Sequence, residues 1–455
     1  MKYNEILAMQ KKYFNSGKTK TYQYRLAALK ALRESLIHYE EEINQALLRD
    51  LNKSPYETFI SEYGLALQQI RQVIRNLKGW MKPASKAVGI AGLPGKAYEL
   101  VEPYGVVLIM SPWNYPLSLT IQPLIGAIAA GNCCVIKPSE LSPHTSDVIQ
   151  KIVARAFPKE YVTTVLGGKE ESEQLLEERF DYIFFTGSTA VGRSVMGKAA
   201  RHLTPVTLEL GGKSPCIILD DADVREAAKN IAYGKVMNSG QTCIAPDYVL
   251  VDETMAEQFC REFTEQCQKM IGNALTNPQY PRIVNRKHFE RLQKLMEGVT
   301  VYSGGHSDGA TLKMEPAVLV DVKSDSPVML EEIFGPLLPV IPCRTMEEAV
   351  KFVEEREKPL ALYLFTKSKD AEKRILGRLS FGGACVNDTI SHIACDGLAF
   401  GGVGESGMGA YHGVHSFETF SHRKGVYKKS SVFELPMRYQ PYNKGVSRLL
   451  RFLMK

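Results

Sequence analysis

The sequence predicts an α/β protein with two α/β domains, the first of which is built on a doubly wound parallel sheet. Two observations support this fold class. From residue 104 onwards, short apolar runs alternate with amphipathic segments of helical length, and the connections between them are short. Alternation of this kind leads to parallel strands joined by right-handed crossovers. The length of 455 residues suits two or three domains.

The chain begins with helices and then enters the first strand-helix series. Residues 22–80 repeat apolar side chains every three or four positions, and Lys and Glu on the opposite face are expected to form a solvated surface. Gly131 is a helix-stop signal for the first helix of the series that follows. We expect strands at 104–110, 133–138, 162–166, 181–186 and 205–210, and helices at 117–132, 143–157, 170–180 and from about 188.

A second series with the same alternation starts near residue 215 and predicts the second α/β domain. Expected strands are 214–220, 247–252, 317–322, 337–343 and 361–366, and expected helices are 223–238 and 254–271. The chain ends in RLLRFLMK, a short basic and apolar tail. A packed or frayed terminus is the simpler interpretation of this tail, and a weak peripheral membrane contact is the alternative.

Composition excludes several classes of protein. The net charge of +6 comes from 56 basic and 50 acidic residues spread along the chain, which does not indicate a nucleic-acid-binding protein. No secretion signal begins the chain, and prolines and polar residues interrupt the most apolar region, so no membrane span is expected. The nine cysteines form no C-x-x-C pair. We therefore expect neither a disulfide scaffold nor a metal site, and a reducing compartment, the cytoplasm, fits best.

One cysteine differs from the rest in its surroundings. Cys243 follows the polar, glycine-bearing stretch NSGQT, whereas Cys133, Cys134, Cys216, Cys260, Cys343 and Cys385 lie in or beside apolar or amphipathic runs and are expected to be buried. A thiol in a polar loop is a candidate nucleophile. Glu209 stands near the end of an apolar strand, where a carboxylate is costly unless it is solvated or paired. Proton transfer, ligand binding and a salt bridge between domains remain alternatives for Glu209.

Three further groups lie at the expected carboxyl ends of strands, where ligands of doubly wound sheets bind. Gly187 and Gly192 have the spacing of the outer glycines of G-x-G-x-x-G, but Thr189 replaces the middle one. Such a turn holds a phosphate, or is simply a helix capped by Ser188. Asn114, between two prolines, is either an oxyanion donor or a residue bonded within its own loop. Lys137 and Glu140 either hold ribose hydroxyls or form a surface ion pair.

Together these segments resemble the aldehyde dehydrogenase superfamily. SPWNYP (111–116), KPSE (137–140), FTGSTAVG (185–192), LELGGKSP (208–215), NSGQTCIAPDYV (238–249), EEIFGP (331–336) and FGGVGESGMGAYHG (400–413) match its motifs in kind and in order. The short N-terminus and the form NSGQTCIAPDY are similar to the class 3 branch, which includes fatty and aromatic aldehyde dehydrogenases.

The resemblance implies a role for each matching residue. Cys243 would be the nucleophile, Glu209 the general base, and Asn114 an oxyanion donor together with the peptide N–H of Cys243. Lys137 and Glu140 would hold the adenosine ribose, and Gly187, Ser188 and Gly192 would lie along the phosphates of the cofactor. Glu332 would hold the nicotinamide ribose and Phe334 would pack near the ring. Tyr115 and Tyr233 would line the aldehyde tunnel, with simple packing as the alternative.

The resemblance also implies an activity and an organisation. We expect NAD-dependent oxidation of an aldehyde to the acid, with NADP as a possible cofactor, through a cysteine thiohemiacetal and thioester. The fairly polar segment 387–402 leaves the aldehyde open. The expected domains are 1–86 with 104–209 for NAD(P), 210–409 for catalysis, 87–103 with 410–440 as a β segment bridging a homodimer, and 441–455 as the tail.

Two other functions compete with this reading. In a CoA-acylating relative a thiol rather than water would take the acyl group, but the water-activating carboxylate of Glu209 would be unhelpful there. A non-catalytic binding or structural protein would have no need of Cys243, Glu209 and Asn114 together.

Overall fold

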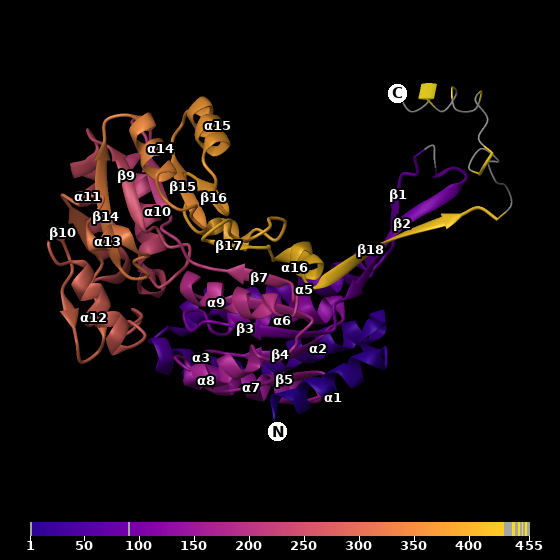
Figure 1. Cartoon of the computed structure of the whole chain (residues 1–455). Coiled ribbons are helices and arrows are strands. Elements are labelled where there is room, and N and C mark those ends of the chain that lie inside the picture. The colour runs from indigo at the N-terminus through magenta and orange to yellow at the C-terminus, as the bar shows by residue number, and fades with distance from the viewer. Residues whose placement is uncertain are drawn as a thin grey trace.

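The computed structural model describes residues 2–89, 92–431, 439–441, 445, 448 and 451–452. It contains two α/β units, each built on a parallel-rich sheet, and a small antiparallel sheet that projects from them as an arm (Figure 1). No helix among the described residues is long and apolar enough to cross a membrane.

The N-terminal part is helical, as the periodicity of 22–80 predicts. Its helices are α1 (Tyr3–Asn15), α2 (Tyr22–His38), α3 (Glu40–Leu51), α4 (Pro55–Thr58) and α5 (Gly64–Trp80), with a π-helical turn at Phe59–Tyr63 between the last two. The expectation that the Lys and Glu residues here form a solvated surface is wrong for Lys53 and Glu62. Both side chains are fully buried, and the ion pair between them offsets part of the cost of that burial.

The first sheet has six strands in the order β17-β7-β6-β3-β4-β5. Every neighbouring pair is parallel except β17 with β7, so the predicted doubly wound sheet is confirmed. Its strands are β3 (Val106–Met110), β4 (Cys133–Lys137), β5 (Val162–Thr164), β6 (Tyr182–Thr186), β7 (Val206–Glu209) and β17 (Gly407–Met408), and its helices are α6 (Ser118–Ala130), α7 (Pro143–Ala156), α8 (Lys169–Leu175) and α9 (Thr189–Ala200). Gly131 ends α6 in the left-handed region at φ 97°, which explains the glycine there.

The second sheet has seven strands in the order β10-β13-β14-β9-β8-β15-β16. The five predicted strands of this series are all present, and the pairing is parallel apart from β10 at one edge. The strands are β8 (Pro215–Ile218), β9 (Tyr248–Asp252), β10 (Thr300–Ser303), β13 (Ala317–Val320), β14 (Leu337–Cys343), β15 (Ala361–Phe365) and β16 (Gly383–Val386). The helices of this unit are α10 (Val224–Val236), α11 (Ala256–Ile271), α12 (Arg286–Leu295), α13 (Pro327–Leu330), α14 (Met346–Glu354) and α15 (Lys369–Arg378), and a short hairpin is formed by β11 (Ser307–Asp308) and β12 (Lys313–Met314).

The projecting arm joins distant parts of the chain. Its strands are β1 (Ala84–Lys86), β2 (Gly95–Pro103) and β18 (Ser421–Lys429), with β2 in the middle, and α16 (Gly413–Thr419) leads into β18. β2 and β18 pair antiparallel in register from Pro103 with Ser421 to Gly95 with Lys429. The division into domains given above stays a prediction. Of the basic tail, only residues 441, 445, 448, 451 and 452 are described, so the membrane contact falls largely outside the described residues.

Candidate active site

Cys243 sits in a constrained loop between α10 and β9. Asn238 and Ser239 adopt left-handed backbone angles (φ 48° and 55°), and Gly240 follows at φ 72°. A Cβ on Gly240 would lie 2.3 Å from the carbonyl oxygen of Gly335, so only glycine fits. Backbone strain of this kind persists where the surrounding structure enforces it, and it concentrates at functional sites. The loop holds the thiol at the amino end of β9, facing the first domain.

A mostly apolar pocket connects this loop with the first sheet. Cys243, Thr242, Glu209, Tyr115 and Tyr233 all line it. Residues of the segment 387–402 complete the pocket. The segment as a whole is fairly polar, but the residues that it contributes to the pocket are mainly apolar. They are Ile390, Ser391, Ile393, Ala394 and Phe400. The path of the backbone through this segment therefore decides which of its side chains line the pocket, and its overall composition does not.

Glu209 ends β7 and is buried inside the pocket. Its exposed fraction is 2%, and neither carboxylate oxygen has a hydrogen-bond partner among the described residues. Burial raises the pKa of this carboxyl well above its usual range. The salt bridge considered as an alternative is not present among the described residues, so the carboxylate remains available to a ligand or to water.

The electrostatics of Cys243 follow from the same burial. Burial, and then the nearby carboxylates of Glu332 and Glu209, raise the pKa of the thiol. The peptide N–H groups of Cys243 and Ile244 act in the opposite direction because they stabilise the thiolate. Burial also raises the pKa of Glu332 to about 8. The other cysteines behave as predicted, since the six expected to be buried are buried.

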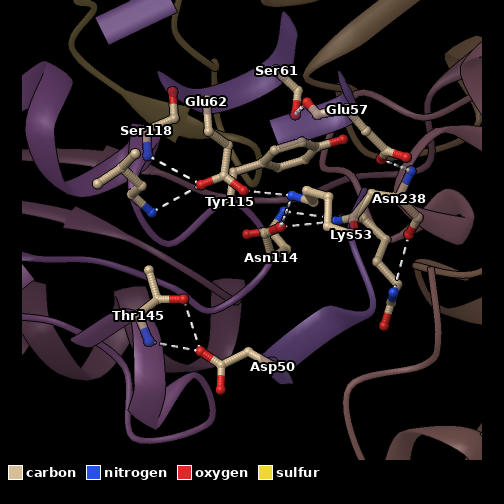
Figure 2. A network of polar contacts seen from close by, with 12 residues as sticks. Asp50, Lys53, Glu57, Ser61, Glu62, Asn114, Tyr115, Ser118, Thr145 and Asn238 are labelled. Carbon is tan, nitrogen blue, oxygen red and sulfur yellow. Dashed lines mark hydrogen bonds and ion pairs between the residues drawn. The ribbon is translucent and has the colours of Figure 1, made fainter. Parts of the chain in front are cut away.

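Asn114 reaches the cysteine loop directly. It follows β3, and its Nδ2 donates a hydrogen bond of 3.1 Å to the carbonyl of Gln241, two residues before Cys243. Its own carbonyl oxygen accepts hydrogen bonds from Lys53 Nζ at 3.2 Å and Asn238 Nδ2 at 2.8 Å (Figure 2). The alternative of an amide bonded within its own loop is not what the structure shows.

The two tyrosines predicted for the aldehyde tunnel differ in exposure. Tyr115 is buried, and its hydroxyl lies 2.7 Å from Thr242 Oγ1, so it packs directly against the residue before Cys243. Tyr233 lies on α10 and is 41% exposed, which places it toward the opening of the pocket.

Lys137 and Glu140 lie at the carboxyl end of β4. Lys137 is buried, and its Nζ donates to the Pro138 carbonyl at 2.8 Å and lies 3.6 Å from Glu140, which is half exposed. Burial lowers the pKa of Lys137. A buried ammonium at a strand end, next to an exposed carboxylate, offers both a donor and an acceptor to a sugar.

The turn after β6 carries the three expected phosphate-side residues. Ser188 caps α9, since its hydroxyl accepts from the N–H of Val191 at 3.5 Å. A Cβ on Gly192 would lie 2.6 Å from Leu210, and one on Gly187 would lie 2.5 Å from the ring of Phe185. The two glycines thus allow close packing of strand and helix, and the amino end of α9 suits an anion.

Glu332 and Phe334 approach the same region from the second domain. Glu332 Oε1 is buried without a partner among the described residues, and its other oxygen lies where a Cβ on Gly211 would be 2.0 Å away. Phe334 packs edge-on against Trp113 with ring centroids 5.4 Å apart. A buried acceptor without a partner, the buried Lys137 ammonium and the glycine turn together fit a dinucleotide. No group of three or more potential metal ligands occurs among the described residues.

Sequence reasoning missed the polar residues behind the cysteine loop. Lys53, Glu57, Glu62 and Asn238 surround the Asn114 backbone in Figure 2. Their only signal in the sequence was a lysine and two glutamates within ten residues, which is common on exposed helices. Nothing in that pattern could indicate that the three side chains turn inward.

Comparison with known proteins agrees with this arrangement. The model of the aldehyde dehydrogenase family matches residues 1–426. The chain is 45% identical to aldehyde dehydrogenase family 3 member B1 of Rattus norvegicus, over 99% of this chain and 97% of that protein. It is 43% identical to the dimeric NADP-preferring aldehyde dehydrogenase of Canis lupus familiaris, over 97% and 98% of the two chains. The structure matches the substrate-bound state of Staphylococcus aureus AldH with a TM-score of 0.97 and 42% identity, over 99% of both chains.

A cysteine loop and a buried carboxylate that share one apolar pocket, beside the edge of a doubly wound sheet, are features of an oxidoreductase with a dinucleotide cofactor. The chain belongs to the aldehyde dehydrogenase family. It oxidises an aldehyde to the carboxylic acid with NAD(P)⁺ as coenzyme.

Proposed function

We propose that Cys243 is the nucleophile of this reaction, because it shares one apolar pocket with Glu209 although the two come from different sheets. The thiol attacks the aldehyde carbon, forming a C–S bond and a tetrahedral thiohemiacetal. The raised pKa of Cys243 means that the thiol is protonated beforehand, so a base has to accept its proton. Glu209, whose oxygens have no protein partner among the described residues, is the candidate base.

The oxyanion of the adduct requires donors. The second N–H of the Asn114 amide and the peptide N–H of Cys243 supply them in this proposal, since Asn114 is already held against the loop by its bond to Gln241. One such donor is worth ~3 kcal/mol of barrier. A bound NAD(P)⁺ would supply the acceptor for the hydride of the adduct, and a thioester would then remain on Cys243.

Glu209 completes the reaction by activating water. Burial raises its pKa, which makes it a stronger base than an exposed carboxylate. The water oxygen attacks the thioester carbon, the C–S bond breaks, and the carboxylic acid and the free thiol result.

The cofactor is proposed to lie across the two sheets. Lys137 and Glu140 would hold the adenosine ribose, Gly187, Ser188 and Gly192 would line the phosphates, and Glu332 and Phe334 would meet the nicotinamide half. The support is the unpartnered Glu332 oxygen and the buried Lys137 ammonium at the same edge. On this proposal the domains are 1–86 with 104–209 for the cofactor and 210–409 for catalysis.

The substrate is proposed to be a medium- or long-chain aliphatic or an aromatic aldehyde. The pocket wall is mainly apolar, with Leu65, Leu119, Ile390, Ile393 and Phe400 among its residues, so a hydrocarbon chain or ring gains by burial there. We further propose a cytoplasmic homodimer, joined through 87–103 and 410–440. One relative is called dimeric, and the arm formed by β1, β2 and β18 projects from the molecule.

The test is NAD(P)H formation with hexanal, with and without CoA. We expect turnover without CoA and free hexanoic acid as product. Cys243→Ala should abolish turnover and leave cofactor binding nearly unchanged. A Cys243→Ala enzyme that oxidises hexanal at a comparable rate would show that the nucleophile is misassigned, and a strict requirement for CoA would favour acyl transfer to a thiol.

A further inference from the structure

The buried polar residues behind the cysteine loop form one connected network. Lys53 and Glu62 are its centre, with Nζ and Oε1 2.5 Å apart and both side chains fully buried. Burying an ion pair costs free energy, and a pair of apolar residues of the same size would often be as stable. A fully buried pair next to a reaction centre therefore calls for an explanation other than stability.

Lys53 and Glu62 each make further hydrogen bonds to the backbone of residues 114–118. Lys53 Nζ donates to the Asn114 carbonyl at 3.2 Å and lies 4.1 Å from the centre of the Tyr115 ring. Glu62 Oε2 accepts from the peptide N–H groups of Leu117 at 2.9 Å and Ser118 at 3.3 Å, at the start of α6. The pair thus holds both ends of the stretch 114–118 (Figure 2).

The same network reaches the cysteine loop from its other side. Glu57 Oε1 accepts from the N–H of Asn238 at 2.8 Å, and Asn238 Nδ2 donates both to the Asn114 carbonyl at 2.8 Å and to the Gln241 carbonyl at 3.1 Å. The Asn114 carbonyl is therefore shared by Lys53 and Asn238, while its side-chain amide bonds to Gln241. Two backbone carbonyls, those of Asn114 and Gln241, each accept two hydrogen bonds from these side chains.

We propose that Lys53 and Glu62 are positioning residues that hold Asn114 in register with Cys243. Lys53 fixes the backbone of Asn114, Glu62 fixes the first turn of α6 behind it, and the amide of Asn114 then points at the oxyanion. The proposal rests on the function proposed for Cys243 and Asn114. A charged donor on the carbonyl also polarises the peptide to which Asn114 belongs and makes its position stiffer than a neutral contact would. Lys53 and Glu62 act on Asn114 and α6 through the backbone and are not assigned a contact with the adduct, so they are positioning and not catalytic residues.

The test uses three network variants and one matched control. Lys53→Met and Glu62→Gln each remove one partner, and the double variant Lys53→Met/Glu62→Gln removes both charges of the pair, so that neither of its members is left as an unpaired charge. The exposed pair Lys151 and Glu42, 2.6 Å apart, supplies the control Lys151→Met/Glu42→Gln with the same change of charge. Kinetics with hexanal, NADH affinity by fluorescence and the thermal midpoint are measured for each.

We expect kcat to fall by about 10- to 100-fold in the double network variant. This loss is smaller than the ~10²- to 10³-fold that follows when an oxyanion donor is removed outright, because here the donor is only displaced. The affinity for NADH should stay within twofold of the parent, and the control should not change. The first burst of NAD(P)H should slow by the same factor, since the displaced donor acts before the hydride leaves. Should the single variants fail to fold, the double variant alone carries the test.

Coupling to Asn114 distinguishes positioning from general structural support. When Asn114→Ala is already present, adding the double network change should lower kcat by less than a further twofold, because the side chain that Lys53 and Glu62 position is already gone. An equal loss in both backgrounds would overturn the proposal, as would a double variant with an unchanged burst rate. If Cys243→Ala remained active, the assignment of the site itself would be wrong, which is a separate outcome.

Discussion

At the scale of single residues, two carboxylates, those of Glu332 and Glu209, act on the thiol of Cys243. The Glu332 carboxylate is the second cause, after burial, of the raised thiol pKa, and Glu332 itself has a pKa of about 8. Its negative charge is therefore largely present only above pH 8. The influence of Glu332 on the thiol should depend on pH in a way that a purely structural role would not.

We expect Glu332→Gln to speed alkylation of Cys243 by iodoacetamide several-fold at pH 9 and to leave the rate unchanged at pH 6.5. The reason is that the variant removes a charge that opposes the thiolate, and a shift of one pKa unit changes the thiolate fraction about tenfold. The rate is followed by mass spectrometry of the peptide that contains Cys243. Glu331→Gln, at an exposed neighbour that pairs with Arg291, is the control. A slower reaction of Glu332→Gln at pH 9 would contradict the assignment.

Glu209 gives a second prediction at this scale. Glu209→Gln keeps the shape of the side chain but cannot accept a proton, so hydrolysis of the thioester should slow by about 10²-fold or more, in line with the loss of a general base. If water activation is its main role, the first burst of NAD(P)H should be less affected than steady turnover. Stopped-flow absorbance at 340 nm, recorded over the first turnover, separates the two phases. Equal loss in both phases would show that Glu209 acts chiefly as the base for the thiol.

At the scale of elements, β17 is the strand that fixes the position of Glu209. Gly407 pairs with Glu209 in the antiparallel register, at φ 139°, and a Cβ there would lie 2.1 Å from the carbonyl oxygen of Leu208. Because that obstacle is backbone, it cannot move aside as a side chain could.

Gly407→Ala should therefore lower the free energy of unfolding by about 2–4 kcal/mol and reduce kcat, since β17 would have to separate from β7. Gly197→Ala is the matched control, because it lies in the interior of α9 with nothing within 4 Å of the added Cβ. That change should stabilise by about 0.5–1 kcal/mol. Urea unfolding and steady-state kinetics measure both. A Gly407→Ala protein as stable and active as the parent would show that the strand pairing is not needed.

The sequence predicted the regular elements well and the long-range contacts poorly. Period and turn signals were enough for β3 to β7 and for α6, where Gly131 marks the end. They gave no sign of β17, a two-residue strand whose partner β7 lies almost two hundred residues earlier. The burial of Lys53 was missed for the same reason, since its partner contacts, such as the Asn114 carbonyl, exist only after folding. Motif residues could be recognised one by one, but the network that holds them could not.

At the scale of the whole molecule, the proposed cofactor site is divided between the two sheets. Lys137 and Gly187 come from the first, and Glu332 and Phe334 from the region before β14 of the second. A ligand that contacts both should therefore stabilise the molecule as a whole rather than one unit. Binding at 100 times the dissociation constant adds about 2.7 kcal/mol to the free energy of unfolding.

We expect both NAD⁺ and NADP⁺ to raise the thermal midpoint, with the smaller shift for NADP⁺ at equal concentration. The half-exposed carboxylate of Glu140, 3.6 Å from Lys137, would accept a bond from a ribose hydroxyl but repel a 2′-phosphate. Glu140→Gln removes the repulsion and leaves Lys137 to attract the phosphate, so the difference between the two cofactors should narrow or reverse. Differential scanning fluorimetry with each cofactor provides the measurement, and Glu355→Gln, an exposed acid on the second unit, is the control. If Glu140→Gln left the two shifts in the same ratio as in the parent, Glu140 would not contact the ribose, and the proposed orientation of the cofactor along the first sheet would have to be abandoned.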